Sequence, residues 1–124
     1  MAIDVNVRKS LGSFSLDVAF SSKGGIVGLL GASGSGKSKT LQCIAGIERP
    51  DEGRVAVNGK PLFDSGSYID MPVQKRRVGY LFQDYALFPN MTVEENINYS
   101  IRKGRSKAER TTVIASMVNR LRLD

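Results

Sequence analysis

One glycine-rich octapeptide constrains the fold of this chain more than any other feature. Its residues match the pattern G-x-x-x-x-G-K-S/T in full: Gly31, Ala32, Ser33, Gly34, Ser35, Gly36, Lys37 and Ser38. The pattern is meaningful where a buried strand runs into the loop and a helix leaves it. A short apolar run at 26–30 precedes the loop, and Leu41, Ile44 and Ala45 recur at helical spacing after it. The sequence therefore predicts a strand, a glycine loop and a helix in succession.

The residue types of this loop suit the binding of phosphate oxygens. Gly34 and Gly36 allow backbone conformations that a Cβ would forbid, so successive N–H groups can turn inward as an anion-binding nest. The helix beginning near Lys37 adds the positive end of its dipole, and the Lys37 ammonium can lie between two phosphates. The Ser38 hydroxyl can ligate Mg²⁺. We therefore expect ATP and Mg²⁺ as cofactors, bound by Gly31, Ser33, Gly34, Ser35, Gly36, Lys37 and Ser38.

Two strands joined around Gly12 and one hairpin are predicted from side-chain alternation and turn chemistry. Residues 3–8 and 14–20 alternate apolar and polar side chains, as half-buried strands do, and Gly12 lies between them. Residues 53–63 are typical of a hairpin whose turn is Asn58-Gly59, because a tight primed turn requires positive φ at both central residues.

The second half of the sequence begins with less regular patterns. Residues 64–71 are predicted to form a polar loop, and residues 77–82 a further strand that ends at Gln83. Two helices should follow, each opened by a capping box: Thr92 with Glu95, and Ser106 with Glu109. An apolar stripe marks the second helix, at Ile114, Met117, Val118 and Leu121.

Composition narrows the class of protein. The 124 residues are one domain's worth of sequence, and no stretch approaches the about 20 apolar residues of a membrane-spanning helix. The N-terminus has neither the basic start nor the apolar run of a signal peptide. The single cysteine, Cys43, is expected to be a buried free thiol, which suits a reducing cytoplasm. The net charge of +6 is spread without aromatic interleaving, so no nucleic-acid partner is expected.

Two further segments carry a family resemblance. Residues 78–97, VGYLFQDYALFPNMTVEENI, resemble the glutamine-loop region of ABC transporter ATP-binding subunits. Residues 44–55, IAGIERPDEGRV, resemble the stretch that follows the phosphate loop in the same family. The two segments have the family's usual separation, and the similarity extends over nearly the whole chain. Residues 75–83 and 36–41 look closest to subunits of molybdate or sulfate importers.

The resemblance implies an α/β fold, the P-loop NTPase fold of the ABC ATPase type. An antiparallel β portion, the strand-helix unit of the phosphate loop and the start of a helical subdomain would make up the chain. Residues 1–91 would be a partial nucleotide-binding core with phosphate loop and glutamine loop, and residues 92–124 the start of the helical subdomain. The implied function is to couple ATP binding and hydrolysis to solute import, in the cytoplasm and peripheral to the inner face of the cell membrane.

The same resemblance assigns roles to particular residues. Lys37 and Gln83 would be catalytic, and Gln83 would approach Mg²⁺ together with Ser38. Residues 84–91 would contact the membrane subunits through Tyr85, Leu87 and Phe88, or else fold onto the chain's own core. The partners implied are those membrane subunits and a second copy of the ATPase subunit, in a homodimer.

The sequence also departs from the family pattern. Lys39 stands where the family usually has threonine at the phosphates, and we include it among the cofactor-binding residues because its charge suits them. Phe14 is expected to face the core. The family's signature sequence, its second acidic strand and its switch histidine are not found in this sequence, which contains no histidine. The chain therefore resembles the first half of such a domain. We expect a strand with an unpaired edge beside the phosphate loop. We also expect the chain to bind nucleotide weakly and not to hydrolyse it.

Two other classes of protein share some of these features. A small kinase or a GTPase can carry the same phosphate loop, but neither an acceptor-binding lid nor a guanine-reading Asn-Lys-x-Asp element is visible. A nucleic-acid binder would use the basic residues and would show strongly salt-dependent affinity.

Overall fold

The computed structural model describes residues 1–84, 87–101 and 103–123. The chain divides into two compact units, Met1–Tyr80 and Leu81–Asp124. The domain boundary expected after residue 91 remains an expectation. Tyr85, one of the predicted contact residues, lies outside the described residues.

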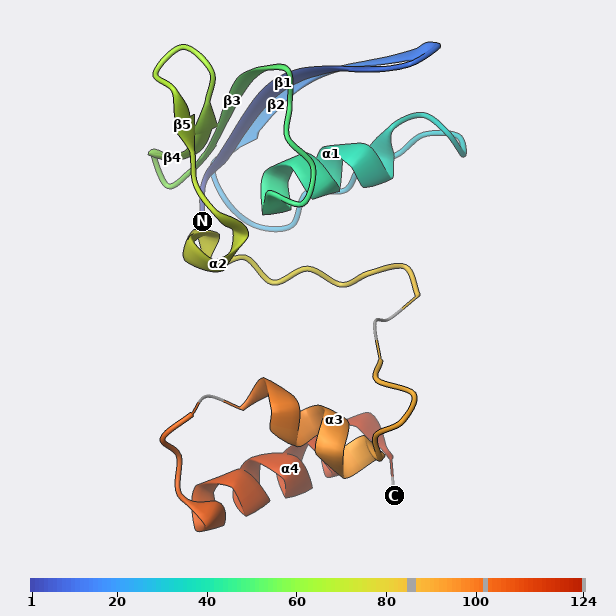
Figure 1. Cartoon of the computed structure of the whole chain (residues 1–124), viewed down its shortest axis with the longest axis vertical. Helices are drawn as coiled ribbons and strands as arrows, with labels where there is room; N and C mark the ends of the chain where they lie inside the picture. Colours follow the sequence, from blue (N-terminus) through green and yellow to red (C-terminus); the bar gives the residue numbers. More distant parts are fainter. Residues whose placement is uncertain (85–86, 102, 124) are drawn as a thin grey trace. The chain divides into compact units, whose positions relative to one another are not determined.

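The first unit is built on a five-stranded antiparallel sheet in the order β2-β1-β3-β4-β5 (Figure 1). Its strands are β1 (Ile3–Leu11), β2 (Phe14–Ser22), β3 (Glu52–Val57), β4 (Lys60–Asp64) and β5 (Ile69–Asp70). The two strands predicted at 3–8 and 14–20 are confirmed, and they pair with Val7 opposite Val18. The predicted hairpin is confirmed too, and its turn residues Asn58 and Gly59 have φ of 52° and 76°.

Every second side chain of a strand points to the same face of the sheet. Most of the apolar side chains of these strands share one face, and that face forms the core. The buried cluster contains Val5, Val7, Leu16, Cys43, Val55, Leu62 and Phe63. Helix α1 (Lys37–Ala45) lies on this face (Figure 1) and contributes Cys43, the buried free thiol that the sequence predicts. The opposite face carries cross-strand ion pairs, in which Arg8 lies between Asp17 and Glu52.

Two predicted strands are wrong. Within the described residues, 26–30 pair with no neighbour, and Ile26 and Leu30 are 101% and 99% exposed. Residues 77–82 likewise belong to no strand of the described sheet, and Leu81 is exposed. An apolar run becomes a strand only where a neighbouring strand supplies hydrogen bonds and cover.

The structure differs from the sequence analysis in three smaller features. The loop predicted at 64–71 contains the short strand β5. Helix α2 (Val73–Arg76) was not predicted, because four residues between Pro72 and the left-handed Arg77 carry no periodic pattern. Leu41, expected on the apolar side of α1, is half exposed, while Thr40 is buried in its place.

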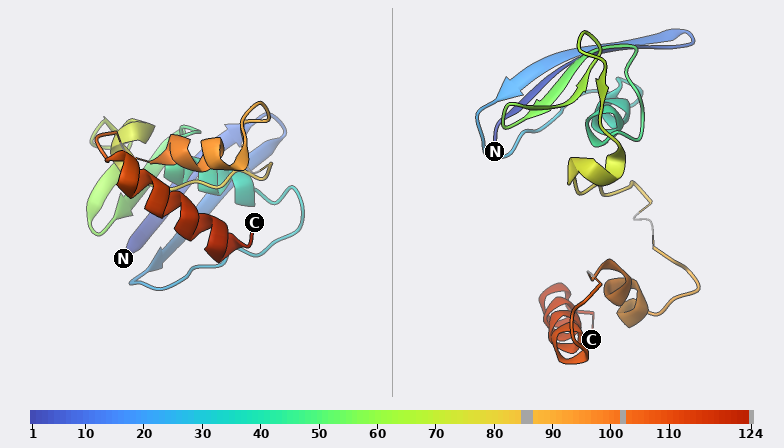
Figure 2. Two further views of the ribbon diagram at one scale, coloured as in Figure 1. Left: turned by 90° about the horizontal axis from the view of Figure 1, so that it is seen from below. Right: turned by 60° about the vertical axis from the view of Figure 1, so that its left-hand side comes forward.

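The described residues of the second unit form two helices, α3 (Val93–Ser100) and α4 (Lys107–Leu121) (Figure 2). Both capping boxes are confirmed, with Thr92 and Ser106 each accepting from the amide three residues later. The stripe on α4 is only partly covered, since Met117 and Leu121 are exposed. Among the described helices, none combines the length and apolar character needed to cross a bilayer.

Candidate functional site

The phosphate loop (residues 31–38) leaves an extended segment and ends at the first turn of α1. The Ser35 amide donates to the Ala32 carbonyl at 3.1 Å, which forms the turn. Gly34 and Gly36 have φ of 81° and 99°, in the left-handed region that favours glycine. The loop thus has the backbone form expected from its sequence.

Gly36 is required by its surroundings as well as by its φ. A Cβ at this position would lie 2.7 Å from Leu16 Cδ1 and 3.3 Å from Phe14 Cζ. Both residues belong to the start of β2, on the face that carries Leu16 into the core. Phe14 is therefore on the expected face, but it is 37% exposed at the edge of the loop. This close approach fixes the start of α1 against the sheet.

The amino end of α1 differs from the amino ends of the other two long helices. Its N-cap is Gly36, no side chain of the described residues caps it, and its first turn contains no acid. Helices α3 and α4 instead have capping boxes and acidic residues in their first turns. Free amides with an uncompensated dipole attract an anion, so α1 alone among these helices begins as an anion-binding end.

Lys37 reaches back across the loop. Its ammonium donates to the Gly31 carbonyl at 2.5 Å, the Ala32 carbonyl at 2.8 Å and Ser35 Oγ at 3.3 Å. All three acceptors are neutral oxygens, and phosphate oxygens would offer stronger, charge-assisted bonds to the same ammonium. The structure therefore brings together Gly31, Ser35 and Lys37 of the predicted set.

The remaining predicted residues occupy more open positions. Ser33 and Gly34 are exposed in the turn, and Ser38 is exposed on the first turn of α1. A pocket of about 190 Å³ borders the loop and is lined by Val18, Leu29, Leu30, Ser35, Gly36, Lys37 and Thr40. Thr40 Oγ1 donates to the Gly36 carbonyl at 2.8 Å and so supports the loop from the buried side. Two glycines with positive φ, a lysine and a hydroxyl at the helix start fit a Mg²⁺-nucleotide.

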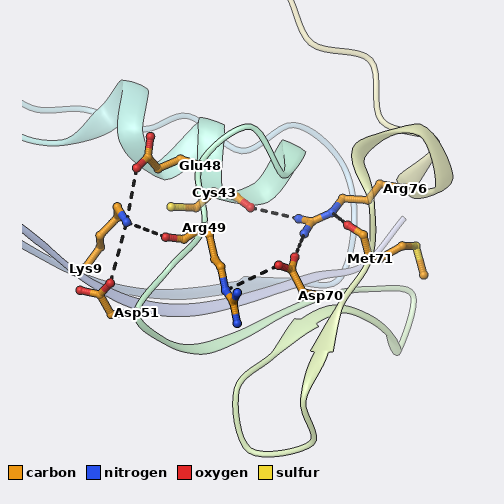
Figure 3. Close-up of polar contacts among 8 residues, drawn as sticks. All are labelled: Lys9, Cys43, Glu48, Arg49, Asp51, Asp70, Met71 and Arg76. Atoms are coloured by element: carbon orange, nitrogen blue, oxygen red, sulfur yellow. Dashed lines mark hydrogen bonds and ion pairs between the residues drawn. The ribbon is translucent and has the colours of Figure 1, made fainter.

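Lys39 follows the phosphate loop, and its ammonium pairs with a residue outside that loop. Its Nζ lies 3.3 Å from Glu48 Oε2, and Lys9 Nζ lies 3.3 Å from Glu48 Oε1. Lys9 also donates to the Arg49 carbonyl at 2.7 Å (Figure 3). Hydrogen bonds from Lys39 and Lys9 lower the pKa of Glu48 below its usual value. The side chain of Lys39 thus pairs with a carboxylate in this structure.

The residues predicted around Gln83 belong to the second unit. Gln83 is exposed in a turn, and Leu87 is exposed beyond it. The Phe88 ring packs on Tyr99 of α3, with centroids 4.8 Å apart and the planes at 60°. Ser38 and Gln83, the two predicted Mg²⁺ ligands, therefore lie in different units.

Arg76 is a structural residue that the sequence patterns did not reveal. Its side chain is 1% exposed, and burial lowers its pKa while Asp70 opposes that shift. The only available signal was indirect, since α1 has no basic residue in its own last turn. A cation near a helix carboxyl end is favourable, and here Arg76 provides it from another segment.

Comparison with known proteins gives consistent results along the chain. A family model described as ABC transporter matches residues 14–124. A molybdenum import ATP-binding protein ModC of Paramagnetospirillum magneticum is 42% identical over 98% of this chain and 33% of its own length. The ModC of Rhizobium johnstonii is 44% identical over 90% of this chain and 30% of its own length. The chain thus spans about a third of the length of these relatives.

Solved structures show the same fold. A dimeric post-hydrolysis state of the ATP-binding cassette MJ0796, bound to ADP and Pi, matches with a TM-score of 0.71 and 27% identity. That match covers 96% of this chain and 56% of the cassette. A second dimeric MJ0796 structure, a bacterial ABC transporter cassette, matches with a TM-score of 0.60 and 25% identity, over 90% of this chain and 53% of the cassette. The predicted fold, that of an ABC-type ATPase, is confirmed.

Proposed function

We propose, since this chain belongs to the ABC transporter family, that its phosphate loop binds the phosphates of ATP together with Mg²⁺. The observation that carries this proposal is the uncapped amino end of α1, which follows a loop closed by Lys37. The ADP-bound state of a structurally similar cassette supports the choice of an adenine nucleotide.

Each loop residue has a part in that binding. The amides around Gly34 and Gly36 donate to phosphate oxygens, and the Lys37 ammonium exchanges its neutral acceptors for charged ones. The exposed Ser38 hydroxyl and the Gln83 amide oxygen are the Mg²⁺ ligands we propose. Mg²⁺, when bound, neutralises phosphate charge. Lys39 is proposed as a further cofactor-binding residue, and its ammonium would have to leave Glu48, 3.3 Å away, to reach a phosphate.

Hydrolysis and transport are proposed for a longer protein. In the described part of the chain, the hydrogen bonds that Lys37 and Thr40 make to the phosphate loop involve no carboxylate that could act as a general base. We propose that this chain binds nucleotide without turning it over. The complete subunit would be an ATPase that drives solute import, with molybdate as the solute suggested by the ModC relatives.

The proposed partners follow from the same family. Residues 84–91 would contact the membrane subunits, with the exposed Leu87 and the partly exposed Phe88 as the described contact candidates. A second copy of the subunit would complete a homodimer, as the dimeric cassettes suggest. The protein would then lie at the inner face of the cell membrane, on its cytoplasmic side.

A fluorescence titration with a labelled ATP analogue tests the binding proposal. Lys37→Ala should raise the Kd at least about tenfold, because hydrogen bonds to a charged group contribute roughly 1.5–3 kcal/mol. Lys60→Ala is the matched control, since it removes the same charge from an exposed position on β4 and should leave the Kd within twofold. Equal affinities for wild type and Lys37→Ala would refute the assignment.

Mg²⁺ dependence gives a second readout on the same chain. Removing Mg²⁺ with a chelator should weaken binding by wild type, and Ser38→Ala should bind alike with and without the ion. A Ser38→Ala variant that keeps the full Mg²⁺ effect would exclude Ser38 as a ligand. Release of phosphate from ATP by the pure chain would contradict the proposed lack of turnover.

A further inference from the structure

The carboxyl end of α1 receives its cation from a distant segment. The amides of Gly46, Ile47 and Glu48 all donate to the Gln42 carbonyl. The carbonyls of the residues that follow Gln42 therefore receive no hydrogen bond from these three amides. Arg76 supplies donors for them. Its Nη1 donates to the Cys43 carbonyl at 3.1 Å (Figure 3) and to the Ile44 carbonyl, also at 3.1 Å. A buried guanidinium therefore caps the phosphate-loop helix from α2.

The other donors of Arg76 fix the direction of its guanidinium. Its Nε donates to the Met71 carbonyl at 2.7 Å, and its Nη2 donates to Asp70 Oδ1 at 3.0 Å. Asp70 also lies 3.6 Å from Arg49 Nε, in the turn after α1. The planar fork thus meets partners on α1, on β5 and on the segment between β5 and α2.

Close packing adds to these bonds. A Cβ at Gly46, the C-cap of α1, would lie 2.7 Å from Arg76 Nε and 2.8 Å from its Cζ. The guanidinium therefore lies directly against the backbone where the helix ends.

The two ends of α1 have different roles. Its amino end carries Lys37 and Ser38, while its carboxyl end is the part that Arg76 holds. A helix of nine residues is too short to be stable alone and depends on its tertiary contacts for position. Because a helix is rigid over this length, a tilt at the capped end displaces the phosphate loop at the other.

We propose that Arg76 is a positioning residue for the phosphate loop, acting through the carboxyl end of α1. This inference rests on the proposed nucleotide binding and deepens it. Arg76 contacts no loop residue, so its effect on nucleotide affinity passes through the placement of the helix. Lysine cannot substitute, because a single ammonium cannot hold four acceptors lying in the plane of a guanidinium.

The test compares two neighbouring arginines on the full chain. Arg76→Lys should stay folded, as judged by circular dichroism and a cooperative thermal transition, yet raise the Kd for the labelled ATP analogue about fivefold or more. Arg77→Lys is the matched control, because Arg77 is exposed and adjacent, and its Kd should stay within twofold of wild type.

Amide chemical shifts separate positioning from general destabilisation. In nucleotide-free ¹⁵N spectra, Arg76→Lys should shift the Gly34 and Gly36 amides, which lie at the far end of α1 from the substitution. A merely structural role would lower the melting temperature and leave these shifts and the Kd unchanged, and that result would overturn the proposal.

A second variant covers loss of folding. If Arg76→Lys is unfolded at 25 °C, Asp70→Asn keeps the arginine and removes its carboxylate partner. It should move the same two amides and weaken binding by a smaller factor; unchanged amides and Kd would overturn the proposal. Failure of wild type to bind, or of Lys37→Ala to lose binding, would instead refute the proposed function itself.

Discussion

The side-chain amide of Asn96 bonds both backbone groups of Phe88, accepting from its N–H at 3.0 Å and donating to its carbonyl at 3.3 Å. The same Nδ2 donates to the Met91 and Thr92 carbonyls at 3.3 Å and 2.9 Å. One side chain of α3 thus holds the turn at 88–92, which includes the last four residues of the segment 84–91 proposed to contact membrane subunits.

Asn96→Asp should loosen this turn. Aspartate keeps an acceptor for the Phe88 amide but loses the donor that three carbonyls share, and each lost hydrogen bond is worth about 1 kcal/mol. We expect amide hydrogen exchange at residues 88–91 to become about tenfold faster. Asn90→Asp, at an exposed position in the same turn, is the control and should leave exchange nearly unchanged. Identical exchange in the two variants would contradict the fastening role.

Gly36→Ala should destabilise the first unit more than Gly34→Ala. Both positions have positive φ, which costs roughly 1–2 kcal/mol for alanine. Only at Gly36 would the added Cβ also meet Leu16. Overpacking should therefore bring the total loss of unfolding free energy for Gly36→Ala to about 2–4 kcal/mol. Urea unfolding of the two variants measures the difference, and equal midpoints would show that the contact with Leu16 relaxes freely.

Glu48→Gln should change the pH dependence of stability. Hydrogen bonds from Lys39 and Lys9 lower the pKa of Glu48, so its carboxylate stabilises the fold at every pH above its unfolded pKa. That contribution, about 0.5–1 kcal/mol for such pairs, is lost as the pH falls through the lowered value in the folded state.

Urea midpoints at several pH values check this linkage. The gap between wild type and Glu48→Gln should be constant from about pH 7 to pH 5 and should close in stronger acid. Glu94→Gln, an exposed change in the second unit, should leave unfolding of the first unit unaffected. A difference in urea midpoint between wild type and Glu48→Gln that increases toward acid would contradict this prediction.

Cys43 should react slowly with thiol reagents in the native chain. Burial is the main cause that raises the pKa of its thiol, and the side chain is fully buried. The labelling rate by a disulfide reagent should keep rising with pH beyond the range in which a free thiol, with pKa about 8.5, levels off. Unfolding in urea should accelerate labelling at neutral pH at least about a hundredfold. Rapid native labelling would show that the face under α1 opens readily.

Local chemistry was predictable wherever neighbouring residues complete each other's bonds. The capping boxes of Thr92 with Glu95 and Ser106 with Glu109 close within one helical turn. The Asn58-Gly59 turn and the alternation in β1 and β2 are equally local. The phosphate loop belongs with them, because Gly34 and Gly36 adopt positive φ within a single turn before α1.

The errors have one physical origin. Residues 26–30 and 77–82 have the apolar character of buried strands, but a strand also needs a partner for its backbone groups. Neither segment belongs to the sheet of the described residues. Apolar character is carried by the residues themselves, whereas pairing depends on residues elsewhere in the chain.

The sequence by itself determined the loop of residues 31–38, the helix that follows it and the family to which the chain belongs, because these depend on residue types at fixed short spacing. Only the tertiary structure decided that Lys39 pairs with Glu48 and that Arg76 caps α1 across 33 residues. Such contacts follow from how the sheet, α1 and α2 pack together, and no local pattern encodes that packing.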